Sequence, residues 1–448
     1  MELSPGQNQR QPAKMQTAKV VPPPPGLPVL GYSNPQEVAY FGRTNYGAGL
    51  EEKRFVFGIK REDRMRHTYV VGKSGTGKSK LLELMIRQDI AYNHGCCVLD
   101  SEGELCENIL DFIPAERLEQ VCVLDPSDSN PPCFNPLLNV DPLLKHQVAQ
   151  GFAEIFERRL GPSWTPQAEH LARLGVLALL DVPDATLESF IRLLTEGEYR
   201  TYALPFITDP MVARFFGQEY AEWSQRHEGS AVIPIISKMS QFLADPSMRR
   251  LFSSPSNKID FVQLMNKREI ILITADRAKL GIDNAAFFES ILAIKLKEAA
   301  SLRAREKQQG GEIAPFYIYL DNFHGLVPSV YEGLLAEGRR SGVALTLSHQ
   351  FVEQLPDRLH TAVLGGVGNI IVFRVGGDDA NLLKTEFSPV FDARDMMGLG
   401  VGEFYIKMLV DGEIKDPFSA ESLKVMPPKH HTLREEIIAS SRKRFSTS

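Results

Sequence analysis

One eight-residue segment, 72–79, constrains this chain more than any other. It has the sequence Gly-Lys-Ser-Gly-Thr-Gly-Lys-Ser and satisfies the pattern G-x-x-x-x-G-K-[ST] of a phosphate-binding loop. Residues 67–71 before it predict a short buried strand, and residues 80–87 after it carry apolar side chains at helical spacing. Such a loop turns backbone N–H groups towards phosphates, and the helix N-terminus adds positive charge. We therefore expect a strand–loop–helix unit that binds a nucleoside triphosphate.

Each member of this loop has an expected role. Lys78 reaches the β- and γ-phosphates, and the hydroxyl of Ser79 joins the coordination shell of Mg²⁺. A glycine-rich loop also closes ordinary strand–helix turns, but the complete pattern in this context favours a site for ATP and Mg²⁺. The remaining nucleotide-binding positions are Gly72, Lys73, Ser74, Gly75, Thr76 and Gly77.

Bulk composition excludes some classes of protein. The chain has 448 residues, enough for two or three domains, and its net charge of −6 argues against a surface that is basic throughout. A local basic channel for nucleic acid remains compatible with that charge. The five cysteines show no metal-ligand spacing and predict buried thiols. With no signal sequence and no apolar run near the ~20 residues of a membrane helix, we expect a cytoplasmic protein with no transmembrane segment.

The chain divides into segments of different composition. Strands alternate with helices on both sides of a nearly all-helical stretch, which predicts an α/β fold with a mostly parallel sheet and an inserted helical domain. Further strands are expected at 54–59, 96–100, 121–125, 269–274, 316–321, 343–348 and 369–374, with a closing hairpin turned at 411–412. The expected segments are a proline-rich extended lead-in (1–40), the first part of the core (41–138), the helical insertion (139–257), the second part of the core (258–426) and a charged C-terminal helix (427–448).

Asp321 is the expected second half of the nucleotide site. It ends the apolar segment 316–320, and a phosphate loop requires a carboxylate at the end of a buried strand to hold Mg²⁺. A strand-end aspartate also caps ordinary turns, but the loop upstream favours the metal role. Ser79 and Asp321 are therefore the predicted metal-binding pair.

The residue after Asp321 bears on catalysis. ATPases of this architecture commonly have a glutamate there, whereas this chain has Asn322, whose amide orients water but accepts no proton. General-base catalysis contributes ~10²–10⁴-fold. We predict that Glu102 or Glu104 substitutes, because adjacent parallel strands bring their C-terminal loops to one crevice. The alternative is that hydrolysis is lost and nucleotide binding only organises an assembly.

Four more polar residues are candidates for the site. Gln350 follows the predicted strand 343–348 and is a candidate sensor of the γ-phosphate, or simply the start of the next helix. Arg339, Arg340 and Arg374 are candidate arginine fingers that reach the nucleotide of a neighbouring subunit. Taken singly, each arginine is more often a partner in a surface ion pair.

Together these features resemble the P-loop ATPases of the HerA/FtsK superfamily, most closely the type IV secretion coupling proteins of the TraD/TraG kind. The resemblance covers roughly residues 55–420 and rests on several motifs in a fixed order. Besides the phosphate loop, the matching segments are 100–105 (DSEGEL), 123–128 (VLDPSD), 134–137 (FNPL), 320–321 (LD), 336–340 (AEGRR), 345–350 (LTLSHQ) and 373–376 (FRVG).

The resemblance implies a RecA-like P-loop NTPase domain that carries an all-helical domain. It further implies a homo-hexameric ring around single- or double-stranded DNA, ATP-driven DNA movement during conjugation, relaxase or secretion-apparatus partners, and contact with the inner membrane through them. Carried over by motif, the roles are nucleotide and Mg²⁺ binding for Lys78 and Ser79, the Walker B acid for Asp321, the sensor for Gln350 and an arginine finger for Arg339 or Arg374.

Two departures from the family pattern concern the chemistry. Asn322 replaces the acidic residue after Asp321, and residues 100–104 read Asp-Ser-Glu-Gly-Glu where the family usually has Asp-Pro-His-Gly-Asp. The third departure concerns membrane anchoring: membrane-anchored coupling proteins have N-terminal transmembrane helices, and we expect none in this chain. The leading hypothesis is a ring-shaped DNA translocase; the alternative is a nucleotide-binding assembly or protein-docking component with little turnover. A metabolic P-loop kinase is disfavoured, because no small-substrate lid pattern is evident.

Overall fold

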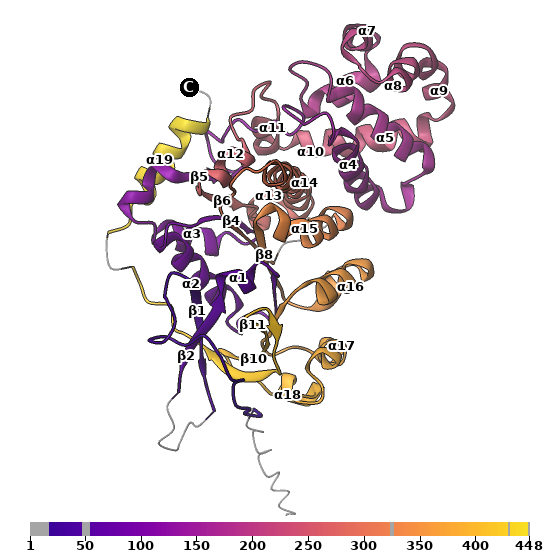
Figure 1. Cartoon of the computed structure of the whole chain (residues 1–448). Helices are drawn as coiled ribbons and strands as arrows, with labels where there is room; N and C mark the ends of the chain where they lie inside the picture. The colour runs from indigo at the N-terminus through magenta and orange to yellow at the C-terminus, as the bar shows by residue number, and fades with distance from the viewer. Residues whose placement is uncertain (1–17, 47–53, 323–326, 429–430, 447–448) are drawn as a thin grey trace, which may run out of the picture.

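A large sheet forms the centre of the molecule (Figure 1). The computed structural model describes residues 18–46, 54–322, 327–428 and 431–446. Within these residues eleven strands form one sheet in the order β2-β1-β13-β10-β9-β3-β8-β7-β4-β6-β5. The strands are β1 (Val38–Thr44), β2 (Val56–Lys60), β3 (Thr68–Val71), β4 (Gly95–Asp100), β5 (Val121–Leu124), β6 (Ile270–Thr274), β7 (Phe316–Asp321), β8 (Val343–His349), β9 (Asn369–Val372), β10 (Glu403–Lys407) and β13 (Phe418–Ser422).

Most of this sheet is parallel. The strands from β9 to β5 in that order pair in parallel, and β10, β13, β1 and β2 extend the sheet with antiparallel pairs. Every residue of β7 and β8 is buried, as expected for strands covered on both faces. The predicted α/β fold class and mostly parallel sheet are confirmed, and the predicted hairpin at 411–412 forms between β11 (Leu409–Val410) and β12 (Glu413–Ile414).

Helices cover both faces of the sheet, and the strands alternate their side chains between two apolar cores. Tyr69, Cys97 and Leu99 point into one core, whereas their neighbours Val70 and Val98 point into the other. The first core is completed by α14 (Ile282–Gln308) and α15 (Pro328–Ser341), and the second by α2 (Lys78–Ala91) and α3 (Glu104–Leu110). The phosphate loop and its helix are therefore fixed to the face opposite α14.

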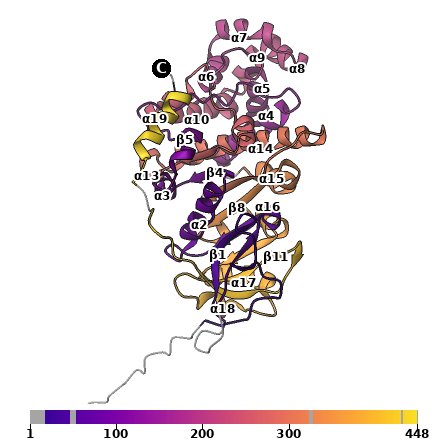
Figure 2. The same cartoon turned by 60° about the vertical axis from the view of Figure 1, so that its left-hand side comes forward.

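The elements between β5 and β6 are helices. Figures 1 and 2 show them gathered at one end of the molecule, on the side of β5 and far from β1 and β2. Thr165, Asp209 and Asp245 cap three of them with their side chains, each followed by a proline at the first helical position. The α-helices are α4 (Lys145–Leu160), α5 (Pro166–Leu179), α6 (Leu187–Thr195), α7 (Gly197–Ala203), α8 (Pro210–Arg214), α9 (Tyr220–Arg226), α10 (Ile233–Ala244), α11 (Pro246–Phe252) and α12 (Phe261–Asn266).

The two ends of the described chain are attached to the sheet. β1 begins at Val38, so the lead-in expected to reach residue 40 ends inside a strand; its first 17 residues lie outside the described part. The C-terminal helix α19 (Arg434–Phe445) packs beside β5, where Ser441 accepts a hydrogen bond from the backbone N–H of Val123 at 2.9 Å. This helix covers the edge strand of the sheet. None of the helices in the described ranges combines the length and the apolar character that a membrane crossing requires.

Candidate nucleotide-binding site

The C-terminal ends of five neighbouring strands lie in a row. β3, β8, β7, β4 and β6 are parallel, and the register places Asp321 opposite both Ser348 and Asp100. Thr274 in turn lies opposite Asp100. The loops that leave these strands therefore meet at one edge of the sheet, as the topology of parallel sheets requires.

The phosphate loop leaves β3 at this edge and is held by its neighbours. The N–H of Gly72 donates to the carbonyl of His349 at 3.2 Å, and the N–H of Lys73 donates to the carbonyl of Arg374 at 2.8 Å. A Cβ at Gly72 would lie 2.6 Å from the Cβ of Phe373, so only glycine fits there. Gly77 has a φ of 118°, which a residue with a side chain rarely adopts. The loop conformation thus depends on glycine at both positions.

Lys78 lies inside the curl of this loop. Its side chain donates hydrogen bonds to the carbonyl of Gly72 at 2.6 Å and to that of Lys73 at 3.0 Å, and the residue is 6% exposed. Burial lowers the pKa of Lys78, while the carboxylates of Asp321 and Glu102 act in the opposite direction. The ammonium group is therefore desolvated and placed between the loop and two acidic residues.

Ser79 and Asp321, the pair predicted to hold a metal ion, are in direct contact. The Ser79 hydroxyl donates to Oδ2 of Asp321 at 2.7 Å. Burial raises the pKa of Asp321, and hydrogen bonds from Ser79 and Ser348 oppose that rise. The structure thus joins the start of α2 to the end of β7 through a hydroxyl and a carboxylate, two groups that Mg²⁺ accepts as ligands.

Asn322 connects three strand ends. Its side-chain amide donates to Oε1 of Glu102 at 2.6 Å, and its backbone N–H donates to the carbonyl of Ser348 at 3.0 Å. Arg277 donates to the Asn322 carbonyl at 2.6 Å. The φ of Asn322 is 52°, in the left-handed region where asparagine is tolerated better than most residues. Asn322 is 6% exposed, so this residue is closely held by its neighbours.

Glu102, one of the two predicted substitutes for the missing glutamate, is the one that reaches Asn322. Its side chain is exposed, and its backbone N–H donates to Oδ1 of Asp100 at 2.9 Å. The other oxygen of Asp100 accepts from the N–H of Cys106 at 3.0 Å. Burial raises the pKa of Asp100, which these backbone hydrogen bonds oppose. Glu104 is the exposed first residue of α3, and the described contacts of Asn322 do not include it.

In the segment after β8, the side chain of Gln354 contacts both Asn322 and the predicted sensor residue Gln350. Gln354 donates to Oδ1 of Asn322 at 3.4 Å and accepts from the backbone N–H of Gln350 at 2.8 Å. Gln350 itself is half-buried at the end of β8. The sequence offered little signal for Gln354 or Arg277, because neither belongs to a motif and only the tertiary fold brings them to Asn322.

The three candidate arginine fingers occupy different places. Arg374 follows β9 beside the phosphate loop and is half-buried. Arg339 and Arg340 are exposed in the last turn of α15, which leads into the start of β8. They lie near the amino-terminal ends of the strands, opposite the loop edge, so they are not part of this subunit's own site.

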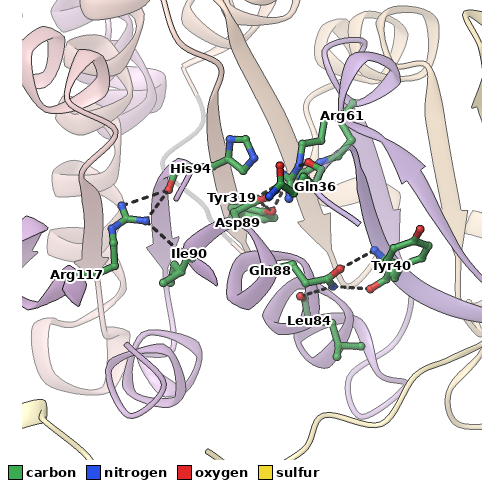
Figure 3. A network of polar contacts seen from close by, with 11 residues as sticks. Gln36, Tyr40, Arg61, Leu84, Gln88, Asp89, Ile90, His94, Arg117 and Tyr319 are labelled. Carbon is green, nitrogen blue, oxygen red and sulfur yellow. Dashed lines mark hydrogen bonds and ion pairs between the residues drawn. The ribbon is translucent and has the colours of Figure 1, made fainter. Parts of the chain in front are cut away.

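A buried polar network attaches the phosphate-loop helix to the strand of Asp321 (Figure 3). Asp89 of α2 is paired with Arg61 and Arg64, and it accepts a hydrogen bond from the hydroxyl of Tyr319 at 2.5 Å. Burial disfavours the ionised carboxyl, but the charges of Arg64 and Arg61 outweigh it and hold the pKa of Asp89 below its ordinary value. Tyr319 precedes Asp321 by two residues on β7, so α2 and β7 are joined at two points.

A cavity of about 1250 Å³ adjoins the phosphate loop. Gly77 and Lys80 form one wall, and residues from the turn before β10 and the segment after β13 form the other. The N–H of Gly402 donates to the carbonyl of Thr76 at 2.9 Å, which fastens this wall to the loop. The cavity therefore continues directly from the loop that curls around Lys78.

Comparisons with known proteins agree with this geometry. The family model for the type IV secretion-system coupling protein DNA-binding domain matches residues 56–379. The bacterial conjugative coupling protein TrwBdeltaN70 in its unbound monoclinic form has a TM-score of 0.61 at 14% identity, over 84% of this chain and 88% of that chain. Plasmid coupling protein TrwB in complex with the non-hydrolysable ATP analogue ADPNP has a TM-score of 0.62 at 14% identity, over 84% of this chain and 89% of that chain.

A third structure, VirB4 of Thermoanaerobacter pseudethanolicus, has a TM-score of 0.53 at 12% identity, over 83% of this chain and 94% of that chain. At these identities the solved structures show a shared fold. No curated protein matches the chain by sequence. The family model spans well over half of the sequence, and the RecA-like P-loop fold predicted from the motifs is the fold of these neighbours. The chain belongs to the family of type IV secretion-system coupling protein DNA-binding domains.

Proposed function

We propose that this protein is a DNA-binding coupling ATPase that binds ATP with Mg²⁺ between residues 72–79 and Asp321. The hydrogen bond of 2.7 Å between Ser79 and Asp321 carries the proposal. It brings a hydroxyl and a buried carboxylate together beside a desolvated lysine, as binding of a magnesium–triphosphate requires. The neighbours solved with ADPNP, and with ADP and Mg²⁺, support the same ligands.

The residues present fit these ligands. Lys78 and the loop N–H groups would hold the phosphates, Ser79 and Asp321 would hold Mg²⁺, and the adjoining cavity has room for the nucleoside. Bound Mg²⁺ supplies charge neutralisation on the phosphate oxygens. Gly72 and Gly77 allow the loop to pack closely against Phe373, where a Cβ at Gly72 would clash, and this packing supports the curled loop that the phosphates require.

Glu102 is the proposed general base for hydrolysis. Its carboxylate is exposed to water and is held by the amide of Asn322 at 2.6 Å. A carboxylate can accept the proton of an attacking water, whereas the amide only orients it. Gln350 is the proposed sensor, and Arg374 or Arg339 the proposed finger for a neighbouring subunit. The place of Arg339 away from its own loop suits a residue that acts on the next subunit.

DNA is the proposed substrate of the motor. The matching family model describes a DNA-binding domain, and the similar TrwB structures are of a conjugative coupling protein. We propose a homo-hexameric ring that moves DNA during conjugation, works in the cytoplasm beside the inner membrane, and receives DNA from relaxase or secretion-apparatus proteins. In such a ring, a few basic residues of each subunit facing the pore would be repeated six times. They would make the channel positive even though the whole chain is acidic.

A second function is favoured by Asn322. If its amide prevents turnover, the protein binds ATP and organises a secretion assembly or docks a protein substrate without hydrolysis. One set of measurements separates the two proposals. ATP hydrolysis with and without DNA, calorimetry with ADPNP, and sizing with nucleotide are compared between wild type and Lys78→Ala. DNA-stimulated turnover supports the motor; tight binding without turnover supports the assembly component; no binding overturns both.

A further inference from the structure

A buried carboxylate lies directly beneath the loop of Glu102. Glu289, on α14, is 0% exposed, and its Oε1 accepts a hydrogen bond of 2.5 Å from the hydroxyl of Ser101, also 0% exposed. Phe288 and Leu292 on the same helix are apolar and equally buried. Placing a carboxylate there is unfavourable unless its partners offset the lost hydration. An apolar residue would satisfy the packing, so this charge needs another explanation.

Ser101 is the residue between the strand-end Asp100 and the proposed base Glu102. Its backbone N–H contacts the carbonyl of Asp321 at 3.5 Å, and its own carbonyl accepts from the N–H of Arg277 at 3.4 Å. Both contacts are long for hydrogen bonds of this type. The short bond to Glu289 is therefore the firmest attachment of Ser101 to the rest of the protein.

The helix that carries Glu289 also carries the main contact with the inserted helices. Phe287 packs against Phe242 of α10 in a tilted arrangement with ring centroids 4.2 Å apart, and it meets Phe156 of α4 edge-on at 6.4 Å. A Cβ at Gly151 of α4 would lie 2.9 Å from Ile294 of α14, so these two helices touch closely. The inserted helices therefore contact α14 within two residues of Glu289.

The electrostatic surroundings of Glu289 also include the inserted segment. Burial lowers the pKa of Arg159 at the end of α4, and the negative charges of Asp283 and Glu289 oppose that lowering. Arg159 is ion-paired with Asp283 at 2.6 Å in the first turn of α14. Glu289 thus lies between a cation of the inserted helices and the loop at the nucleotide site.

We infer that Glu289 is a positioning residue: through Ser101 it holds the loop of Glu102 and couples that loop to α14 and the inserted helices. The inference rests on the proposed ATPase function and adds a route by which a partner on the inserted helices alters turnover. The role assigned to Glu289 depends on its hydrogen bond with the Ser101 hydroxyl and not on contact with nucleotide or attacking water.

The test compares variants that remove or keep the hydrogen bond. Ser101→Ala and Glu289→Leu remove it, Glu289→Gln keeps an acceptor for the hydroxyl, and Ser290→Ala is a matched control. Ser290 is also buried on α14, but it bonds to the carbonyl of Ala286 within its own helix. We expect Ser101→Ala and Glu289→Leu each to lower kcat by roughly 10- to 100-fold, as a misplaced catalytic group does. Their ADPNP affinity should stay within about twofold of wild type, since a positioning group acts on turnover and not on ground-state binding.

Two further readouts separate positioning from stability alone. The Ser101→Ala, Glu289→Leu double variant should be no slower than the worse single variant, because both remove one contact, and Glu289→Gln should recover most of kcat. Addition of ADPNP and Mg²⁺ should change amide hydrogen exchange in α14 and α4 of wild type and Ser290→Ala, but not of Ser101→Ala. The inference is overturned if Ser101→Ala and Glu289→Leu keep the kcat of wild type and if ADPNP with Mg²⁺ still changes amide hydrogen exchange in their α14 and α4. That result would leave the ATPase proposal intact.

If wild type binds ADPNP without turnover, the exchange measurement alone decides the inference. If wild type binds no nucleotide, the ATPase proposal fails and this inference fails with it.

Discussion

The side-chain amide of Asn322 donates a hydrogen bond to Oε1 of Glu102 at 2.6 Å. The two residues follow adjacent parallel strands: Asn322 comes one residue after Asp321, and Glu102 comes two residues after Asp100, which is paired with Asp321. A carboxylate from the loop after the neighbouring strand thus lies in hydrogen-bond contact with the residue that follows Asp321. We propose that the pair divides the work of one glutamate between a proton acceptor and a fixed donor.

Glu102→Gln should lower kcat for ATP hydrolysis by about 10²–10⁴-fold, because it removes the proposed proton acceptor and preserves size and hydrogen bonding. Nucleotide affinity should change little. Steady-state hydrolysis with calorimetry on the same preparations measures both quantities. Glu104→Gln is the matched control, since Glu104 lies in the same loop and is exposed. Equal rates for Glu102→Gln and wild type would exclude Glu102 as the base.

Asn322→Glu tests the same relationship from the other side. Alone, it would place a second carboxylate against Glu102, and like charges raise the pKa of one of them. Asn322→Glu should change kcat less in the wild-type protein than in the Glu102→Gln variant. In the Glu102→Gln variant, the new glutamate should restore much of the lost kcat. Failure of the double variant to exceed Glu102→Gln in kcat would show that the two positions cannot exchange this role.

Asp321→Asn should abolish the dependence of ATP affinity on Mg²⁺. The buried carboxylate is the negatively charged member of the Ser79–Asp321 pair, and an amide of the same size attracts the cation far less. We expect ATP affinity measured with Mg²⁺ to fall roughly 10- to 100-fold, or about 1.4–2.8 kcal/mol, with little change when EDTA is present. Calorimetry in the two buffers measures this difference. Asp378→Asn, on the exposed first turn of α17 (Gly377–Phe387), is the control.

His67 should make the stability of the fold depend on pH. It is 2% exposed, its Nδ1 accepts from the N–H of Leu345 at 3.0 Å, and its Nε2 lies 3.0 Å from the carbonyl of Leu335. Burial lowers the pKa of His67 to about 4 from 6.5, and the bond to Leu335 only partly opposes this. The folded protein therefore binds fewer protons than the unfolded chain between these values. Stability should be fully present above pH ~6.5 and decline towards pH ~4, by on the order of 3 kcal/mol.

Urea unfolding at pH 7.5 and pH 5 measures this dependence. His67→Gln should be less stable at pH 7.5 but show a shallower decline on acidification. An unchanged slope in His67→Gln would assign the decline to other groups.

The sequence was sufficient where function depends on a contiguous pattern. The loop 72–79 and Asp321 follow from their own segments, since glycine torsions and a strand-end acid are local requirements. The rule that parallel strands end at one edge indicated Glu102 or Glu104 without choosing between them, and only the structure shows that Glu102 is the one in contact with Asn322. Gln354 and Arg277 were not predictable, because each lies in a short helical turn (Val352–Gln354 and Arg277–Leu280) whose position only packing determines.

Glu289 and β1 were missed for related reasons. Glu289 lies in a long helix with charged residues along its sequence, so nothing in the pattern distinguishes a buried carboxylate from a solvated one. β1 follows a proline-rich segment, which favours an extended lead-in, and its burial comes from pairing with β2 and with β13, a strand more than 350 residues later. Long-range pairing of this kind leaves no local signal.

The network around Asp89 should be a large contributor to cooperative folding, and it supplies the last prediction. Asp89→Asn leaves two buried arginines without their shared carboxylate, which typically destabilises a protein by about 3–5 kcal/mol. Tyr319→Phe removes one hydroxyl that donates to Asp89 and accepts from Arg64 at 2.5 Å, so a smaller loss of about 1–3 kcal/mol is expected. Chemical denaturation of both variants measures the difference. Because Tyr319 shares β7 with Asp321, Tyr319→Phe should also weaken Mg²⁺-dependent ATP binding, whereas Tyr40→Phe, whose hydroxyl bonds to the carbonyl of Ser33 at 3.1 Å, should not. A loss of unfolding free energy below about 1 kcal/mol in Asp89→Asn would contradict this prediction, because two buried arginines that have lost their shared carboxylate should destabilise the fold.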